Sequence, residues 1–247
     1  MIRVAAVGDM HFTPDSSGRL RENFETLHER ADVLLLAGDL TGHGTVEEAS
    51  ALAREIEGLE IRMVAVLGNH DCHSDQQDRI SALMEGAGVH VLEGESTVLA
   101  VGGESLGIGG VKGFVGGFTE GASWGEFGEP QMRELIRHTR ESAERLQATL
   151  EDLTVDRRIA LLHYAPVEAT VKGEHPQMYP FLGSFLLAEA IDAAGADLVV
   201  HGHAHYGSEE GVTPRGIQVR NVAHTVIRRP YCVFEVGAGA SVGAGGA

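Results

Sequence analysis

The sequence of 247 residues predicts an α/β fold, because short apolar runs alternate with amphipathic segments through the first third of the chain. Residues 2–7, 33–37 and 61–67 have the length and composition of buried strands. Residues 18–30 and 45–57 carry apolar side chains at helical spacing between these runs. Repeated strand–helix–strand units imply parallel strands that are joined by right-handed crossovers.

The middle of the chain is expected to be antiparallel. A third helix is predicted over residues 76–85, and three short strands with glycine-rich turns follow at residues 89–92, 97–101 and 105–108. Residues 109–128 contain many glycines and predict a long loop. A loop of this length inside a compact domain is commonly functional or mobile.

The last third returns to buried strands. Pro130 opens a long amphipathic helix, because proline is favoured at the first helical position. Apolar runs at residues 158–162 and 197–200 predict two more strands, with a helix over residues 184–194 between them.

The end of the chain is expected to close the fold. Residues 216–221 and 231–236 are predicted to form an antiparallel pair with each other. We expect a single domain over residues 1–236, followed by a flexible Gly/Ala tail over residues 237–247.

The composition is that of an acidic globular protein, with 43% apolar residues and a formal net charge of −17. The acidic balance disfavours a nucleic-acid partner, which would require a basic patch. No apolar run approaches the roughly 20 residues that a membrane span needs. Because Cys72 and Cys232 are isolated and no export signal is apparent at the N-terminus, we expect a cytoplasmic protein.

Side chains that bind metals follow five of the predicted strands. They stand in the segments VGDMH, LAGDL, LGNHD, LLHY and VVHGHAH. In open α/β sheets, ligands bind outside the carboxyl ends of parallel strands, so these side chains should meet in one crevice. The candidate metal ligands are Asp9, His11, Asp39, Asn69, His163, His203 and His205.

The number and type of these candidates suit two divalent cations. Imidazole suits Zn, Fe and Ni, whereas carboxylate and amide oxygens favour harder ions such as Mn. Asp9 and His11 would face the same side of an extended strand, as would His203 and His205. Seven candidates exceed the four ligands of one tetrahedral zinc site, and Asp39 is the best candidate for a shared carboxylate.

Glycines precede several candidate ligands, and they permit tight turns and a close approach of the backbone. These glycines are Gly8, Gly38, Gly68 and Gly202. Taken singly, each motif could equally be a set of caps and turn residues at strand ends. Their order along the chain, each after an apolar run, favours a metal site.

In this order the motifs resemble the full set of the calcineurin-like metallophosphoesterases. The matching motifs are Asp9-x-His11, Gly38-Asp39, Gly68-Asn69-His70-Asp71, His163 and Gly202-His203-x-His205. The resemblance implies a four-layer α/β/β/α sandwich of two mixed sheets. It also implies one metal on Asp9, His11, Asp39 and His205, and a second on Asp39, Asn69, His163 and His203.

The resemblance implies hydrolysis of a small phosphodiester or phosphomonoester by a hydroxide that bridges two metals. Mn is the expected metal, with Fe, Zn or Ni as alternatives. His70 is assigned to phosphate contact and to proton donation to the leaving group. Asp71 would orient His70, or would instead cap a helix. Residues 109–128 and 164–183 do not identify the substrate.

Two other functions are open. The fold could serve as a non-catalytic, metal-stabilised scaffold for partner proteins, or its metals could hydrolyse another bond such as an amide. Among the remaining residues, His201 is expected behind the ligands rather than among them, and His224 is a candidate contact. Phe114 and Trp124 are expected to pack the long loop on its own scaffold.

Overall fold

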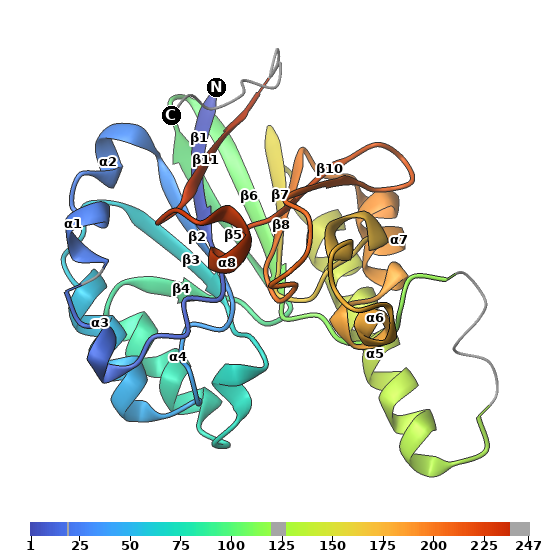
Figure 1. The fold of residues 1–247 in the computed structure, drawn as a ribbon. Helices are drawn as coiled ribbons and strands as arrows, with labels where there is room; N and C mark the ends of the chain where they lie inside the picture. The colour runs from blue at the N-terminus through green and yellow to red at the C-terminus, as the bar shows by residue number, and fades with distance from the viewer. Residues whose placement is uncertain (19, 120–126, 238–247) are drawn as a thin grey trace.

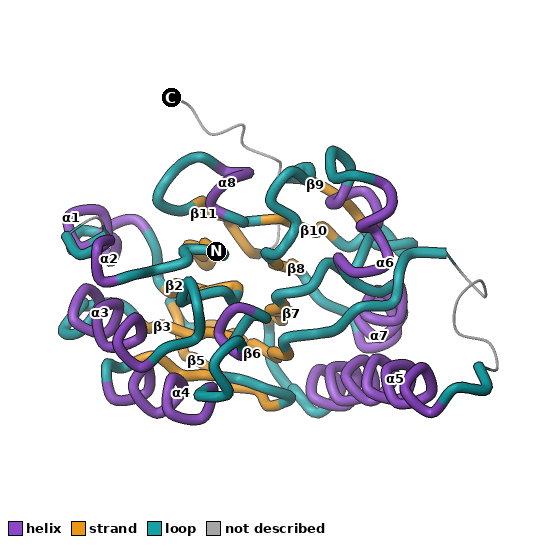
Figure 2. The backbone as a smooth tube through the Cα atoms, turned by 60° about the horizontal axis from the view of Figure 1, so that its bottom comes forward, coloured by secondary structure: helices purple, strands orange, loops and turns teal. Residues whose placement is uncertain are grey.

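Two mixed β-sheets face each other and helices cover their outer sides, which confirms the expected four-layer α/β/β/α sandwich (Figures 1 and 2). The computed structural model describes residues 1–18, 20–119 and 127–237. Trp124 and the part of the predicted tail that follows Gly237 lie outside the described residues.

The first sheet contains the N-terminal strands in the order β11-β1-β2-β3-β4. The four strands from β1 to β4 are parallel, and β11 closes the edge antiparallel to β1. Their bounds are β1 Ile2–Val7, β2 Val33–Ala37, β3 Arg62–Val66, β4 Val89–Val91 and β11 Cys232–Val236.

The second sheet has the order β5-β6-β7-β8-β10-β9. Its four central strands are parallel, whereas β5 and β9 pair antiparallel at the two edges. The bounds are β5 Glu95–Val101, β6 Glu104–Val111, β7 Arg157–Leu162, β8 Leu198–His201, β9 Glu210–Val212 and β10 Gln218–Asn221.

Helices α1 to α4 cover the first sheet, and α5 and α7 cover the second (Figure 2). The α-helices are α1 Arg21–Phe24, α2 Leu27–Arg30, α3 Val46–Ile56, α4 Gln77–Gly86, α5 Pro130–Glu151, α6 Tyr179–Leu182, α7 Phe185–Ala194 and α8 His224–Ile227. Four short 3₁₀ turns complete the described elements: η1 Pro14–Ser16, η2 His70–Cys72, η3 Glu168–Val171 and η4 Pro176–Met178.

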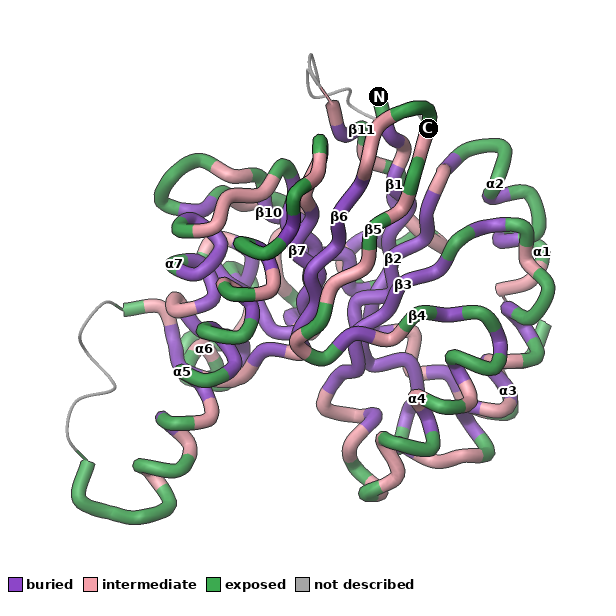
Figure 3. The backbone as a smooth tube through the Cα atoms, turned by 180° about the vertical axis from the view of Figure 1, so that it is seen from behind, coloured by how far each residue is buried: buried purple, intermediate pink, exposed green. Residues whose placement is uncertain are grey.

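Strand β7 shows how the layers are built. Ile159 and Leu161 belong to the apolar cluster shared with the first sheet, whereas Ala160 and Leu162 belong to the cluster under α5 and α7. Successive side chains of a strand point to opposite faces, so both faces of this strand are buried. Figure 3 shows the same burial along the central strands.

The predicted pairing of the last two strands is wrong. β10 instead pairs parallel with β8 and antiparallel with β9, and β11 pairs antiparallel with β1 in the other sheet. Helix α8 lies between them in sequence, and the chain passes from one sheet to the other there (Figure 1). Both strands have short apolar patterns, which do not specify a partner.

The middle of the chain also differs from expectation. β4 pairs parallel with β3, so only β5 and β6 form the expected antiparallel hairpin. β6 continues to Val111, into the stretch predicted as loop. Its glycines are packed rather than loose: a Cβ atom on Gly109 would lie 2.8 Å from Leu150 Cδ2 of α5. The glycine content therefore reflects close helix–strand packing in this part of the stretch.

Candidate metal centre

The candidate ligands lie at the carboxyl ends of the central strands of both sheets. β2 lies between β1 and β3 in the first sheet, and β7 pairs with β8 in the second. Asp39 follows β2, which lies between β1 and β3 both in the sheet and along the chain. This position suits it to contact ligands that arrive from either side.

One group of ligand atoms combines Asp9, His11, Asp39 and His205, all within 4.8 Å of one another. His205 Nε2 lies 2.9 Å from Asp9 Oδ1 and 3.3 Å from His11 Nε2. His11 Nε2 lies 3.8 Å from Asp39 Oδ2. Three segments far apart in the chain thus contribute to one small cluster.

A second group combines Asp39, His163 and His203, whose ligand atoms also lie within 4.8 Å of one another. His163 Nε2 is 3.4 Å from Asp39 Oδ1 and 2.9 Å from Asn69 Oδ1. The two groups share Asp39, and Asn69 joins the second through His163. The structure therefore brings all seven predicted ligand side chains together in two adjoining clusters.

The hydrogen bonds of the imidazoles leave lone pairs facing these clusters. His163 Nδ1 donates to the carbonyl oxygen of Ala37 at 2.9 Å, so in the neutral ring Nε2 carries the lone pair. His203 Nε2 donates to the carbonyl oxygen of Phe181 at 3.2 Å, which leaves Nδ1 free to bind a metal. Lone pairs and carboxylates that converge in this way fit divalent cations, and the backbone carbonyls fix the ring orientations.

The pKa shifts of the candidate ligands are consistent with binding of divalent cations. Burial lowers the pKa of His203 to about 3 and also lowers the pKa of His11, so both rings favour the neutral form that binds metals. Burial alone would raise the pKa of Asp9, but the hydrogen bond from His205 and the neighbouring imidazoles outweigh it and lower this pKa. The same hydrogen bond raises the pKa of His205.

The backbone around these ligands is strained. The non-glycine residues Asp9, His11, Asp39 and His203 have positive φ angles of 55°, 43°, 48° and 68°. This region is disfavoured for residues with a Cβ atom, and such strain gathers at functional sites. The expectation that Asp9 and His11 share one face of an extended strand is wrong, since β1 ends at Val7 and both lie in a left-handed turn.

The glycines before the ligands make room for ligands of other segments, as their positions predicted. A Cβ atom on Gly68 would lie 2.1 Å from Asp39 Oδ1, and one on Gly202 would lie 2.2 Å from Asp9 Oδ2. Real Cβ atoms essentially never come so close, so a side chain at either position would force the neighbouring carboxylate to move.

His70 lies beside the first group. Its ring packs edge-on against His11, with 4.4 Å between the ring centroids. Its Nδ1 donates to the carbonyl oxygen of Gly42 at 2.7 Å, so Nε2 is the ring atom left for another partner. Its backbone N–H donates to Asp39 Oδ1 at 2.8 Å. His70 thus also holds the shared carboxylate in place.

Asp71 is completely buried, and its carboxylate is engaged by the backbone. It accepts hydrogen bonds from Leu40 N at 3.1 Å, Thr41 N at 2.8 Å, Thr41 Oγ1 at 2.6 Å and Gly68 N at 2.8 Å. Among the hydrogen bonds described for this carboxylate, none comes from His70. Asp71 instead ties the loop after β2 to the loop after β3.

Two buried residues support the ligands from behind. His201 donates from Nδ1 to the Gly202 carbonyl oxygen at 2.7 Å, and its Nε2 lies 2.8 Å from Thr170 Oγ1. Burial lowers the pKa of His201 to about 4. Tyr164 was not singled out from the sequence, yet its ring lies 4.3 Å from that of His203 and 5.4 Å from that of His163. The one sequence feature that could have pointed to Tyr164 is its position directly after the candidate ligand His163.

The aromatic side chain of Phe114 packs on its scaffold, as expected. Its ring lies 4.5 Å from that of His138 on α5 and 6.0 Å from that of Tyr164. Residues of the segment 164–183 reach the clusters through the Phe181 carbonyl oxygen, which accepts from His203. This segment therefore borders the candidate metal centre.

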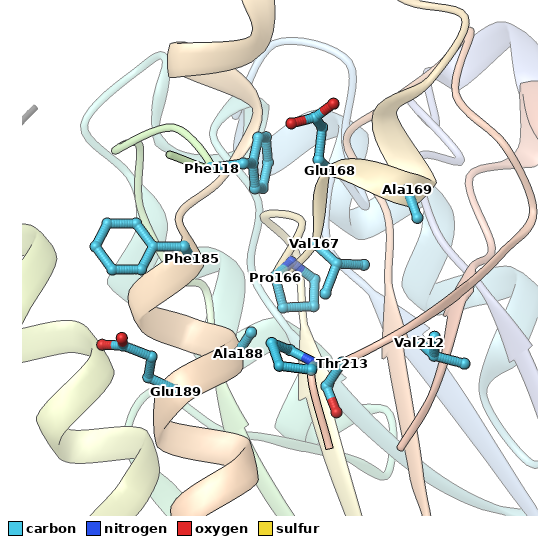
Figure 4. A pocket seen from close by; sticks show the side chains of 11 residues that line it. Phe118, Pro166, Val167, Glu168, Ala169, Phe185, Ala188, Glu189, Val212 and Thr213 are labelled. Atoms are coloured by element: carbon cyan, nitrogen blue, oxygen red, sulfur yellow. The ribbon is translucent and has the colours of Figure 1, made fainter. Parts of the chain in front are cut away.

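A pocket of about 300 Å³ lies between η3, α7 and the end of β9 (Figure 4). Phe118, Pro166 and Phe185 supply much of its apolar wall, and Glu168 and Glu189 border it. None of the seven candidate ligands lines it. The two carboxylates would repel a phosphate group, so this pocket does not suit the phosphate of an ester.

A model of the calcineurin-like phosphoesterase family matches residues 2–207, which is most of the chain. The chain belongs to the calcineurin-like phosphoesterases. The match covers every candidate ligand. Among the described residues of this family member, no helix has the length and apolar character to cross a membrane.

Two curated proteins resemble part of this phosphoesterase. One is a 3′,5′-cyclic-nucleotide phosphodiesterase from Nostoc, 34% identical over 83 residues that cover 29% of this chain and 31% of the relative. The other is a symmetrical bis(5′-nucleosyl)-tetraphosphatase from Nitrosococcus oceani, 33% identical over 98 residues that cover 40% of this chain and 31% of the relative. The chain thus matches about a third of the length of each.

Solved structures share the fold of this phosphoesterase. A phosphopantetheinyl hydrolase from Mycobacterium tuberculosis has a TM-score of 0.67 at 17% identity, and the match covers 97% of this chain and 98% of the other. A putative 5′-nucleotidase from Staphylococcus aureus has a TM-score of 0.57 at 16% identity, covering 89% of this chain and 48% of the other. At these identities the likeness concerns the fold.

Proposed function

We propose that this protein hydrolyses small phosphate esters with two divalent cations, one in each of the two ligand clusters. The observation that carries this proposal is the sharing of Asp39 between the two groups of ligand atoms. Two adjoining cation sites that share a carboxylate are the arrangement of two-metal phosphoryl hydrolysis. The family membership supports the same reaction class.

The residues of the chain would hold the cations in fixed positions. Asp9, His11, Asp39 and His205 would hold one, and Asp39, Asn69, His163 and His203 the other. When bound, the cations supply a hydroxide near neutral pH and positive charge for the phosphate oxygens. Mn is the proposed metal, because oxygen ligands stand beside imidazoles, and Fe, Zn and Ni are the alternatives.

His70 is proposed to contact the phosphate and to donate a proton to the leaving oxygen. The Gly42 carbonyl fixes its ring through Nδ1, so in the imidazolium form Nε2 would carry the proton that is transferred to the leaving oxygen. Asp71 is proposed as a positioning residue, because its carboxylate binds the loops that carry Asp39 and Asn69.

The proposed substrate is a small phosphate ester. Phosphodiesters such as cyclic nucleotides are the first candidates, and phosphomonoesters are the second. The protein is proposed to act in the cytoplasm. The names of the two curated relatives, a cyclic-nucleotide phosphodiesterase and a dinucleoside tetraphosphatase, support a nucleotide-like substrate. The net charge of −17 speaks against a long nucleic acid.

A hydrolysis screen tests the proposal. The protein is loaded with Mn, Fe, Zn or Ni and offered p-nitrophenyl phosphate, bis-p-nitrophenyl phosphate and cyclic nucleotides. We expect metal-dependent release of product from at least one ester. Two bound metals without hydrolysis of any phosphate ester would contradict the proposal and favour the scaffold.

A further inference from the structure

A second pocket, of about 220 Å³, lies between the end of β1 with the loop that follows it, α1 and α8. Its apolar walls come from Val7, Met10, Phe12, Leu20 and Pro230. Its polar lining consists of Ser16, Asn23 and His224. None of the lining residues is Asp, Glu, Lys or Arg, so the pocket presents no formal charge when His224 is neutral.

The pocket is joined to the candidate metal centre by the backbone. Met10, one of its walls, stands between the candidate ligands Asp9 and His11. His224 N donates to the carbonyl oxygen of Gly8 at 2.9 Å, directly before Asp9. Thr225 Oγ1, on the same helix α8, donates to the carbonyl oxygen of His205 at 2.9 Å. The loop after β1 therefore carries both residues of the pocket and ligands of the first cluster, and α8 is hydrogen-bonded to the segments of two of those ligands.

The size and lining select for one kind of group. Pockets for drug-sized molecules enclose about 300–1,000 Å³, so this one suits a single ring system rather than a large ligand. A Met thioether and apolar walls make favourable contacts with a flat aromatic ring. The exposed His224 lines the pocket and offers a ring nitrogen that could exchange a hydrogen bond with the edge of such a ring.

We propose that this pocket, defined by its lining from Val7 to Pro230, binds the neutral heteroaromatic ring of the substrate's organic group, such as a nucleobase. This inference rests on the proposed function for its substrate, since the phosphate would lie at the metal clusters while the ring enters the pocket. The preferred substrates are then nucleoside esters rather than simple alkyl phosphates.

The test compares two diesters with the same leaving group on the Mn-loaded protein. Thymidine 5′-p-nitrophenyl phosphate carries a base, and methyl p-nitrophenyl phosphate does not. We expect kcat/KM to be at least about 10-fold higher for the thymidine ester, because contacts with the heteroaromatic ring would stabilise its transition state by about 1.4 kcal/mol. Equal values for the two esters would overturn the inference.

Two variants locate the effect in the pocket. Leu20→Asp introduces a charge into it, and His224→Ala removes an exposed polar group. Each is expected to reduce the preference for the thymidine ester several-fold and to leave the methyl ester within about 2-fold. His28→Ala, an exposed histidine on α2 outside the pocket, is the matched control and should retain the preference. Equal losses on both esters would contradict the inference.

Binding of thymidine itself separates this inference from the proposed function. Ligand-observed NMR with free thymidine needs no hydrolysis, and we expect millimolar binding that weakens in Leu20→Asp and His224→Ala. If neither ester were hydrolysed, the proposed function would fail while this binding still tested the pocket. Absence of thymidine binding to the wild-type protein would overturn the pocket assignment.

Discussion

Nε2 of His163 lies 2.9 Å from Oδ1 of Asn69, and in the neutral ring neither atom carries a proton. Nδ1 of that ring donates to the carbonyl oxygen of Ala37 at 2.9 Å, which leaves the lone pair of the neutral ring on Nε2. Two acceptors at this distance repel unless a cation lies between or beside them. The contact supports the proposal that the second ligand cluster holds a cation.

Metal removal should destabilise the fold measurably. A cation at 100 times its Kd contributes about 2.7 kcal/mol per site, which is roughly 5–10 °C in Tm for a chain of this size. Differential scanning fluorimetry with Mn and then with excess EDTA measures the change. Equal Tm values in both conditions would show that the clusters do not bind Mn.

Asp39→Asn should weaken both metal sites at once, because the shared carboxylate loses its charge. We expect at least a 100-fold loss of affinity for the cations, since even residues behind the ligands typically cost about 10–100-fold. Isothermal titration with Mn measures it. Asp152→Asn, an exposed residue at the end of α5, is the control. Retention of one tight site in Asp39→Asn would argue against sharing.

His70→Ala should lower the rate according to the leaving group. General acid catalysis contributes about 10²–10⁴-fold, so we expect losses in that range on alkyl esters, whose leaving oxygen needs a proton. Nitrophenyl esters should lose much less, because nitrophenolate leaves without one. Metal content should stay at the wild-type level, and His90→Ala on β4 provides a control. Equal losses on both ester types would remove the proton-donor role.

Gly202→Ala should disturb the first cluster. The new Cβ atom would meet Asp9 Oδ2 at 2.2 Å, so the carboxylate must move. We expect weaker Mn binding and a lower Tm. Gly86→Ala in α4 is the matched control, because nothing lies within 4 Å of its Cβ position and alanine favours a helix. A similar Mn affinity in both variants would contradict the role of Gly202.

Asp71→Ala should destabilise the protein and both metal sites. It leaves three buried backbone N–H groups, on Leu40, Thr41 and Gly68, without their acceptor, and each such loss costs about 1–3 kcal/mol. We expect an overall loss of at least about 3 kcal/mol in urea unfolding, with reduced Mn affinity. A loss in kcat alone, with stability and Mn affinity unchanged, would instead make Asp71 a catalytic residue.

The site was more predictable than the strand pairing. The ligands, from Asp9 to His205, follow apolar runs, and the carboxyl ends of parallel strands converge in space, so their meeting follows from order and spacing. The partner of β10 could not be predicted, because short apolar strands fit many neighbours and α8 sends the chain to the other sheet.

The backbone conformation at the ligands and the contacts of Asp71 could not be predicted from the sequence, because both depend on tertiary packing. Sequence spacing placed Asp9 and His11 on one face of a strand, but both adopt positive φ angles that tertiary contacts impose. Asp71 looked like a partner of His70 because they are adjacent in sequence. Its burial among backbone N–H groups depends on how the loops after β2 and β3 pack, which the sequence does not encode locally.

The most direct test of the central claim is a titration of metal-free protein with Mn, in which bound metal and hydrolysis of bis-p-nitrophenyl phosphate are measured on the same samples. Two shared-ligand clusters predict that bound metal and activity both reach their plateau at two equivalents per chain. A plateau of activity at one equivalent, or two bound equivalents without hydrolysis, would contradict the two-cation account.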